Sequence, residues 1–235
     1  MSASAIHPDQ DARSTAVLTS GGLDSVVLLA AEAQRHTVQP IYVSCGLAWE
    51  PVERESLTRF LAAYRAPRPI LPLATLEFLL SDIYPKQHWA IRGAPPEYNA
   101  PDNEVYLIGR NITLLAKAGI FCATAGIGRI AMGQLQGNPF PDATPAFFSA
   151  MAHALSLGLD HDLDVSFPFL AMKKAAVIQL GVSLGVPLEL TISCMNPQGS
   201  KHCGACNKCR ERKDAFAASG VEDRTVYDTR RPTSV

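Results

Sequence analysis

A strand, a glycine turn and a helix follow one another in residues 17–29, VLTSGGLDSVVLL, and this order limits the fold more than any other part of the sequence. A short apolar strand is expected at 16–19, the turn is Ser-Gly-Gly at 20–22, and an Ala- and Leu-rich segment without Gly or Pro follows at 23–35. Glycines let a ligand approach the backbone, and a helix N-terminus offers unpaired N–H groups and the positive end of the helix dipole. The stretch therefore predicts an α/β unit that binds an anion, above all a phosphate.

The turn differs from a Walker phosphate loop. It lacks the Gly-Lys-[Ser/Thr] ending, and no lysine is present to reach a terminal phosphate, so hydrolysis in the manner of a motor protein or a GTPase is not expected. A purely structural interpretation stays open at this point. Glycine can serve only the dihedral angles of the turn, while Asp24 and Ser25 merely favour the first turn of the helix.

The rest of the chain alternates between short apolar stretches and helix-like segments, which is the pattern of an α/β domain with a mostly parallel sheet. Residues 86–103 are rich in proline and show no clear period, which predicts a long surface excursion. We expect strands at 15–19, 38–44, 68–73, 129–134 and 164–169, and helices at 23–35, 112–126, 145–159 and 173–185, with Asn111 capping the second helix and Gly126 at its end.

Charge and apolar runs exclude several classes of protein. The formal net charge of −1 gives no basic footprint of the kind that nucleic-acid binders carry, so nucleic acid is not expected as a partner. Residues 1–13 are small, polar and charged, which predicts a flexible N-terminal tail without the apolar middle of a secretory signal. The apolar runs are shorter than the roughly 18 residues that a membrane span needs. We therefore expect a soluble, cytoplasmic protein.

Four of the six cysteines gather near the end of the sequence, in residues 194–209. Four thiolates this close can surround one tetrahedral zinc ion, and they leave no open position for a catalytic water. A disulfide framework is not expected in a cytoplasmic protein. The sequence therefore predicts a structural zinc site, with the ligands Cys194, Cys203, Cys206 and Cys209. It also predicts an α/β domain over 14–190, a zinc-binding segment with a helix over 191–220, and a C-terminal tail over 221–235.

The turn SGGLDS resembles the SGG-x-DS loop of the N-type ATP pyrophosphatases, a family with the adenine nucleotide alpha hydrolase-like (PP-loop) fold. The resemblance implies that the loop holds the pyrophosphate of ATP while ATP is split into AMP and pyrophosphate, and that Asp24 lies near Mg²⁺. The residues that it assigns to ATP binding are Ser20, Gly21, Gly22, Leu23, Asp24 and Ser25.

Further motifs resemble one branch of these proteins, the 7-cyano-7-deazaguanine synthase family of queuosine biosynthesis. They are GRN at 109–111, PFPDATPAFF at 139–148, FPFLAMKKAAVI at 167–178, SCMN at 193–196 and HCGACNKCRER at 202–212. The resemblance thus extends over most of residues 16–216, and its first and last motifs are the most specific.

This second resemblance implies a definite reaction. ATP activates the carboxylate of 7-carboxy-7-deazaguanine, ammonia displaces AMP to give an amide, and a second ATP activates the amide so that the loss of AMP leaves a nitrile. The implied cofactors are ATP, Mg²⁺ and Zn²⁺, and a homodimer is expected. The implied catalytic residues are Asp24, Arg110, Asp142 and Lys174, for which a surface salt bridge at Arg110, a helix cap at Asp142 and a solvated position at Lys174 are the plain alternatives.

The sequence departs from the family in segments that are expected to line the acceptor pocket. Residues 44–50 read SCGLAWE and keep only Gly46 of the family motif, residues 134–138 lack the usual acids, and Ala176 stands where an acid is usual. Three alternatives therefore stay open. The chain can adenylate another carboxylate or amide, it can act on a tRNA base, or it can be a non-catalytic, zinc-stabilised nucleotide-binding module.

Overall fold

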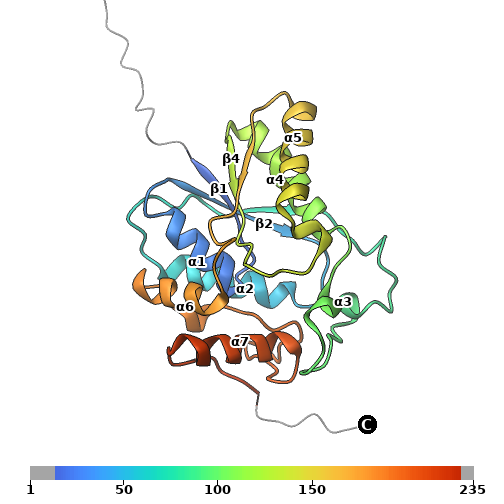
Figure 1. Cartoon of the computed structure of the whole chain (residues 1–235), viewed down its shortest axis with the longest axis vertical. Coiled ribbons are helices and arrows are strands. Elements are labelled where there is room, and N and C mark those ends of the chain that lie inside the picture. The colour runs from blue at the N-terminus through green and yellow to red at the C-terminus, as the bar shows by residue number, and fades with distance from the viewer. Residues whose placement is uncertain (1–13, 229–235) are drawn as a thin grey trace, which may run out of the picture.

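The computed structural model describes residues 14–228 (Figure 1). The expected flexible tail at 1–13 lies outside the described residues. Five strands form one sheet in the order β3-β2-β1-β4-β5, and every neighbouring pair is parallel. The strands are β1 (Thr15–Leu18), β2 (Val38–Ser44), β3 (Ala74–Glu77), β4 (Arg129–Ala131) and β5 (Asp164–Ser166). The prediction of an α/β fold with a parallel sheet is confirmed.

The strand order reverses its direction beside β1. The chain proceeds from β1 to β2 and β3 on one side, and then returns to place β4 and β5 on the other side. The register sets Ala16 of β1 opposite both Gln39 of β2 and Ile130 of β4. In open α/β sheets, ligands bind in the crevice outside the carboxyl ends of the strands at such a reversal. The glycine turn after β1 lies at this point.

Helices cover both faces of the sheet. Alternate strand residues point to opposite faces, so that Val17 and Tyr42 belong to one core while Ala16 and Ile41 belong to the other. Figure 1 shows α1 and α6 on one side and α4 and α5 on the other. None of the helices within residues 14–228 is long and apolar enough to cross a membrane. The helices are α1 (Leu23–Glu32), α2 (Glu50–Ala63), α3 (Trp89–Arg92), α4 (Arg110–Ala125), α5 (Pro145–Leu159), α6 (Lys174–Ser183) and α7 (Asn207–Ser219), with 3₁₀ turns at Asp102–Val105, Pro141–Ala143 and Leu188–Leu190.

Two local predictions are wrong. The strand expected at 68–73 begins only at Ala74, and the earlier segment makes one isolated bridge, because its prolines have no N–H to donate to a ladder. Asn111 does not cap α4. Gly109 takes that position with φ at +78°, a left-handed conformation that glycine adopts without strain, and Asn111 lies in the first turn. Gly126 ends the helix as expected.

Two further segments add to the expected pattern. The helix α2, EPVERESLTRFLAA, is not predicted from the sequence, because its charged residues interrupt the apolar ones. The excursion at 86–103 contains α3, an isolated bridge at Glu97 and the start of the 3₁₀ turn Asp102–Val105, with irregular chain between them.

Replacing Leu115 in α4 with alanine should destabilise the fold by about 2–5 kcal/mol, because its side chain is fully buried between the helix and the sheet. Denaturant unfolding followed by circular dichroism measures the change. The matched control is Ile120→Ala on the same helix, whose side chain is half exposed and should cost much less. Equal losses at the two positions would contradict the assignment of the α4 core face.

Candidate active site

The turn between β1 and α1 is held by its own hydroxyl groups. Ser25 Oγ accepts a hydrogen bond from the backbone N–H of Ser20 at 3.1 Å and donates one to the carbonyl of Gly22 at 3.0 Å. Ser20 Oγ accepts from the N–H of Gly22 at 3.3 Å. Gly22 caps α1 without any side-chain hydrogen bond to the helix. The conformation of the turn is therefore fixed, while no side chain occupies the backbone N–H groups at the start of α1. An anion site at a helix N-terminus requires both features.

Gly21 must be glycine for steric reasons. Its φ is +76°, and a Cβ at this position would lie 2.7 Å from the carbonyl oxygen of Glu53 in α2. Its own carbonyl accepts a hydrogen bond from the N–H of Ile192, which comes from the segment before the cysteine cluster. The loop is thus fixed between two distant parts of the chain. The side chain of Leu23 packs into the core, which leaves its main chain as the part that a ligand can meet.

A chain of alternating charges begins at Asp24, in the first turn of α1. Lys174 Nζ, at the start of α6, lies 3.2 Å from Asp24 Oδ2 and 2.5 Å from Oε1 of Glu211 in α7. Lys208 Nζ contacts the other oxygen of Glu211 at 2.5 Å. The structure thus brings together Asp24 and Lys174, two of the predicted catalytic residues.

Burial and pairing compete in setting the pKa values of this cluster. Burial raises the pKa of Asp24, although Lys174 opposes the shift. Burial alone would lower the pKa of Lys174, but the carboxylates of Asp24 and Glu211 raise it above its usual value. Burial likewise disfavours the charge of Glu211, and the two lysines hold its pKa at about 2. Lys174 is therefore a cation in the folded protein, and it is not the solvated residue that the plain alternative described.

Arg110 and Asp142 lie at the start of α4, on the other face of the sheet. The backbone N–H of Asn111 donates to Asp142 Oδ2 at 3.1 Å, and Asn111 Nδ2 donates to the carbonyl of Asp142 at 2.8 Å. Asp142 therefore caps α4 from a distance, which replaces the cap that was expected from Asn111. Burial raises the pKa of Asp142, and the bond from Asn111 opposes the rise.

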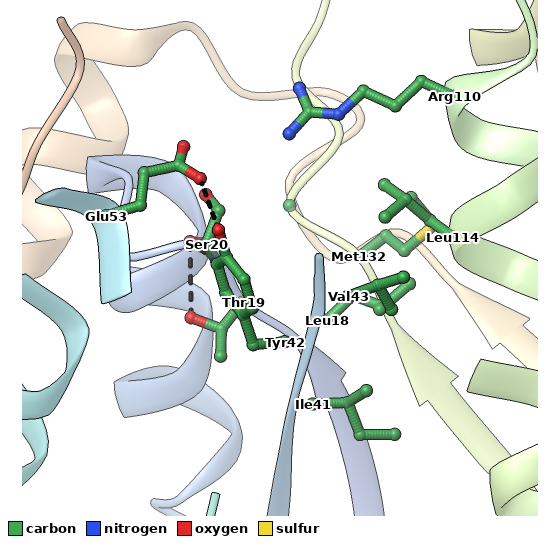
Figure 2. Close-up of a pocket in the computed structure, with 12 residues that line it drawn as sticks. Leu18, Thr19, Ser20, Ile41, Tyr42, Val43, Glu53, Arg110, Leu114 and Met132 are labelled. Atoms are coloured by element: carbon green, nitrogen blue, oxygen red, sulfur yellow. Dashed lines mark hydrogen bonds between the residues drawn. The ribbon is translucent and has the colours of Figure 1, made fainter. Parts of the chain in front are cut away.

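A cavity of about 160 Å³ opens between the loop and α4 (Figure 2). Thr19, Ser20 and Ser25 line its polar side, and the guanidinium of Arg110 points into it from α4. Arg110 Nε is buried and has no hydrogen-bond partner among the described residues. The guanidinium is thus aimed at the cavity, with Nε available to a ligand. The apolar wall consists of Leu18, Ile41, Val43, Leu114 and Met132.

Glu53 faces Arg110 across the cavity and was not predicted from the sequence (Figure 2). Tyr42 Oη donates a hydrogen bond of 3.1 Å to Glu53 Oε2. Burial raises the pKa of Glu53 to about 7, and the charge of Arg110 limits the rise. Its position could have indicated a role. Glu53 lies in the first turns of the helix that follows β2, where side chains reach the crevice of a parallel sheet.

The departure at 44–50 has a structural explanation. The carboxylate of Glu50 accepts hydrogen bonds from Ser44 Oγ at 2.6 Å, from the N–H of Cys45 at 2.7 Å and from the N–H of Gly46 at 3.2 Å. These bonds close the turn between β2 and α2. In the second departure, in the segment after β4, Gln134 Nε2 is buried without a partner among residues 14–228.

The four predicted zinc ligands come together. The ligand atoms of Cys194, Cys203, Cys206 and Cys209 lie within 4.8 Å of one another. Sγ of Cys206 and Sγ of Cys209 are 3.6 Å apart, and Sγ of Cys203 and Sγ of Cys209 are 3.9 Å apart. Zn–S bonds near 2.3 Å in a tetrahedron place sulfurs roughly 3.8 Å apart. The cluster therefore fits a tetrahedral metal ion, and four thiolates favour zinc.

Comparison with known proteins assigns the family. Residues 14–220 match the family model described as "Queuosine biosynthesis protein QueC". The chain belongs to the QueC family. A 7-cyano-7-deazaguanine synthase of Methanopyrus kandleri is 32% identical over 228 residues, which cover 91% of this chain and 98% of that protein. The synthase of an Anaeromyxobacter species is 31% identical, with 90% and 94% covered.

A solved structure, described as a predicted subunit of a tRNA methyltransferase from Methanocaldococcus jannaschii, overlaps 72% of the chain and 74% of its own length, at a TM-score of 0.45 and 13% identity. The QueC assignment rests on the sequence matches.

Replacing Cys206 with serine should lower the metal content and the melting temperature together, because a structural site contributes its binding free energy to folding. Elemental analysis and thermal unfolding of the same preparations give both values. Cys122→Ser is the matched control, since Cys122 is buried in α4 far from the cluster and should reduce stability without metal loss. Full zinc retention in Cys206→Ser would contradict the ligand assignment.

The raised pKa of Glu53 predicts a pH dependence of stability. A carboxyl whose pKa lies near 7 in the folded state and near 4.5 in the unfolded state favours folding below about pH 4.5, and this contribution is lost as the pH rises through 7. The free energy of unfolding of the wild type should therefore fall by about 3 kcal/mol at most between about pH 4.5 and 7, and that of Glu53→Gln should not show this fall. Parallel pH profiles of the two zinc-loaded proteins would show that Glu53 is an ordinary carboxylate.

Proposed function

We propose that this QueC-family protein is an ATP-dependent ligase that converts 7-carboxy-7-deazaguanine and ammonia into 7-cyano-7-deazaguanine. One observation carries the proposal. The uncapped N-terminus of α1 and the Asp24–Lys174 pair lie on one side of the sheet reversal and Arg110 lies on the other, so that two anions can be held close together between them. The synthase names of the relatives support the choice of acceptor.

The loop would bind the pyrophosphate of ATP. The start of α1 offers backbone N–H groups, and Ser20 and Ser25 keep the turn in shape. Asp24 Oδ1 is buried and has no hydrogen-bond partner among the described residues, so Asp24 can hold a divalent cation. Mg²⁺ in that place would neutralise phosphate charge. Lys174 adds a fixed positive charge beside it.

The residues of this chain would prepare the acceptor for attack on ATP. Arg110 can pair with the carboxylate of the acceptor, and the apolar wall of the cavity keeps water from competing with it. The carboxylate oxygen attacks the α-phosphorus and pyrophosphate leaves. Ammonia then forms the C–N bond and AMP leaves. A second ATP activates the amide oxygen, and the loss of this AMP and protons gives the nitrile.

The principal test is pyrophosphate release, with the product identified by mass. Asp24→Asn should reduce turnover by a factor on the order of 10²–10³, because a group that stabilises the charge of the transition state is lost. The matched control is Asp82→Asn, an exposed carboxylate outside the site.

Three results would each have a distinct meaning. Unchanged turnover in Asp24→Asn would contradict the assignment of the loop. Release of pyrophosphate only with another carboxylate would keep the loop and replace the acceptor, in agreement with the departures at 134–138. Binding of ATP without any release would favour a non-catalytic nucleotide-binding module.

A further inference from the structure

We propose that Glu211 is a positioning residue of the phosphate loop: it shares the ammonium of Lys174 with Asp24, and thereby leaves the carboxylate of Asp24 available to the divalent cation that accompanies ATP. The network itself is visible in the structure. The inference rests on the proposed function only in taking a cation with a nucleotide as the ligand of Asp24.

The geometry divides one cation between two carboxylates. Lys174 Nζ is closer to Glu211 Oε1, at 2.5 Å, than to Asp24 Oδ2, at 3.2 Å. The three side chains come from three helices, α1, α6 and α7, and meet half-buried at their junction, with 15–25% of each side chain exposed. An ammonium group has three N–H donors, so one remains for a ligand when the two carboxylates have each taken one. Glu211 therefore draws Lys174 away from an exclusive pair with Asp24.

One carboxylate oxygen of Asp24 supports the inference independently of the Lys174 contacts. Asp24 Oδ1 is buried and has no partner within the described part of the chain, whereas Oδ2 faces Lys174. A buried carboxylate oxygen without a partner is costly unless a ligand fills the place. If Lys174 moved fully onto Asp24, it would compete with an entering cation for this carboxylate.

The cysteine cluster fixes the position of Glu211. Cys206 is the cap of α7 and Cys209 lies in its first turn, so two of the four metal ligands set where the helix begins. One helical turn on, Arg212 fixes the rotation of α7. Its guanidinium is fully buried and donates to Thr191 Oγ1 at 2.9 Å and to the carbonyl of Leu188 at 3.0 Å. The cysteine cluster therefore sets the position of α7, and α7 places Glu211 beside Lys174.

Lys208 completes the arrangement from the same helix. Its Nζ holds the second oxygen of Glu211 at 2.5 Å, so that each oxygen of this carboxylate has one lysine partner. With both carboxylates ionised, the charges of the four side chains balance. A change at Glu211 should therefore act mainly by redistributing Lys174, and an exposed carboxylate elsewhere on α7 should not reproduce it.

The test measures cation binding rather than turnover. Mn²⁺ is titrated into the zinc-loaded protein with the non-hydrolysable α,β-methylene analogue of ATP, and free Mn²⁺ is followed by electron paramagnetic resonance. Glu211→Gln should weaken Mn²⁺ binding by roughly 5–20-fold, within the usual range of coupling between two sites. Binding of the analogue without a divalent cation should not weaken, because the variant removes no positive charge.

Three further variants isolate the cause. Asp214→Asn makes the same charge change at an exposed position of α7 and should leave Mn²⁺ binding unchanged. Glu211→Asp keeps the charge but withdraws the carboxylate from Lys174, and should weaken Mn²⁺ binding in the same direction as Glu211→Gln. In a Lys174→Met background, Glu211→Gln should have no further effect. Glu211→Asp also provides the test if Glu211→Gln fails to fold or to retain zinc.

Several outcomes would overturn the inference. Equal Mn²⁺ affinity in the wild type and both Glu211 variants would do so, as would an undiminished effect of Glu211→Gln in the Lys174→Met background. If Asp214→Asn weakened Mn²⁺ binding as much as Glu211→Gln, the loss of one negative charge anywhere on α7 would explain the effect, and the contact with Lys174 would not. If the wild type binds neither Mn²⁺ nor the nucleotide analogue, the proposed function fails together with the inference.

Discussion

The close approach of three chain segments at Gly21 is the constraint on which the site depends. There is no room for a side chain at this residue, because the backbone of α2 lies against it and the N–H of Ile192 bonds to its carbonyl. The loop after β1 therefore has one shape, set by segments about 30 and 170 residues further along the chain. The uncapped start of α1 and the direction of Asp24 both follow from this shape.

The segment with the cysteine cluster and α7 packs against the same core as the loop after β1. Ala215 and Phe216 of α7 pack into the core that α1 and α6 share, so the helix that follows the cysteines is part of the main hydrophobic structure. Arg212 of this helix is buried with hydrogen bonds from its guanidinium to Thr191 and Ser193, which lie next to the cluster. A change in the cysteine cluster would thus disturb the start of α6, which carries Lys174. The cysteine cluster and the loop after β1 thus share one set of supports.

Local sequence was sufficient for the parts of the fold that depend on local physics. The strand, turn and helix at 15–32 follow from apolar pattern and glycine, and the cysteine spacing predicts a cluster that the structure confirms. The prediction of a strand at 68–73 was wrong. It relied on the apolar residues of this segment, whereas its prolines have no N–H groups to donate to a ladder. The prediction that Asn111 caps α4 was wrong, because the side chain that caps this helix belongs to Asp142, about 30 residues away.

The remaining site residues could not be predicted from pattern. Glu53 and Glu211 look like ordinary solvent-facing glutamates of polar helices, and only the tertiary structure places one opposite Arg110 and the other against Lys174. The resemblance to a family brought Asp24 and Lys174 into the same list, but it did not indicate that they form an ion pair. Long-range contacts thus decide the electrostatics, while local sequence decides the framework.

The most direct test of the central claim follows oxygen from the acceptor. The reaction is run with 7-carboxy-7-deazaguanine labelled with ¹⁸O at both carboxylate oxygens, and the products are analysed by mass spectrometry. We expect AMP to carry the label in both half-reactions, since each oxygen attacks an α-phosphorus and leaves with AMP, and we expect pyrophosphate to carry none. Unlabelled AMP, or label in pyrophosphate or free phosphate, would contradict it.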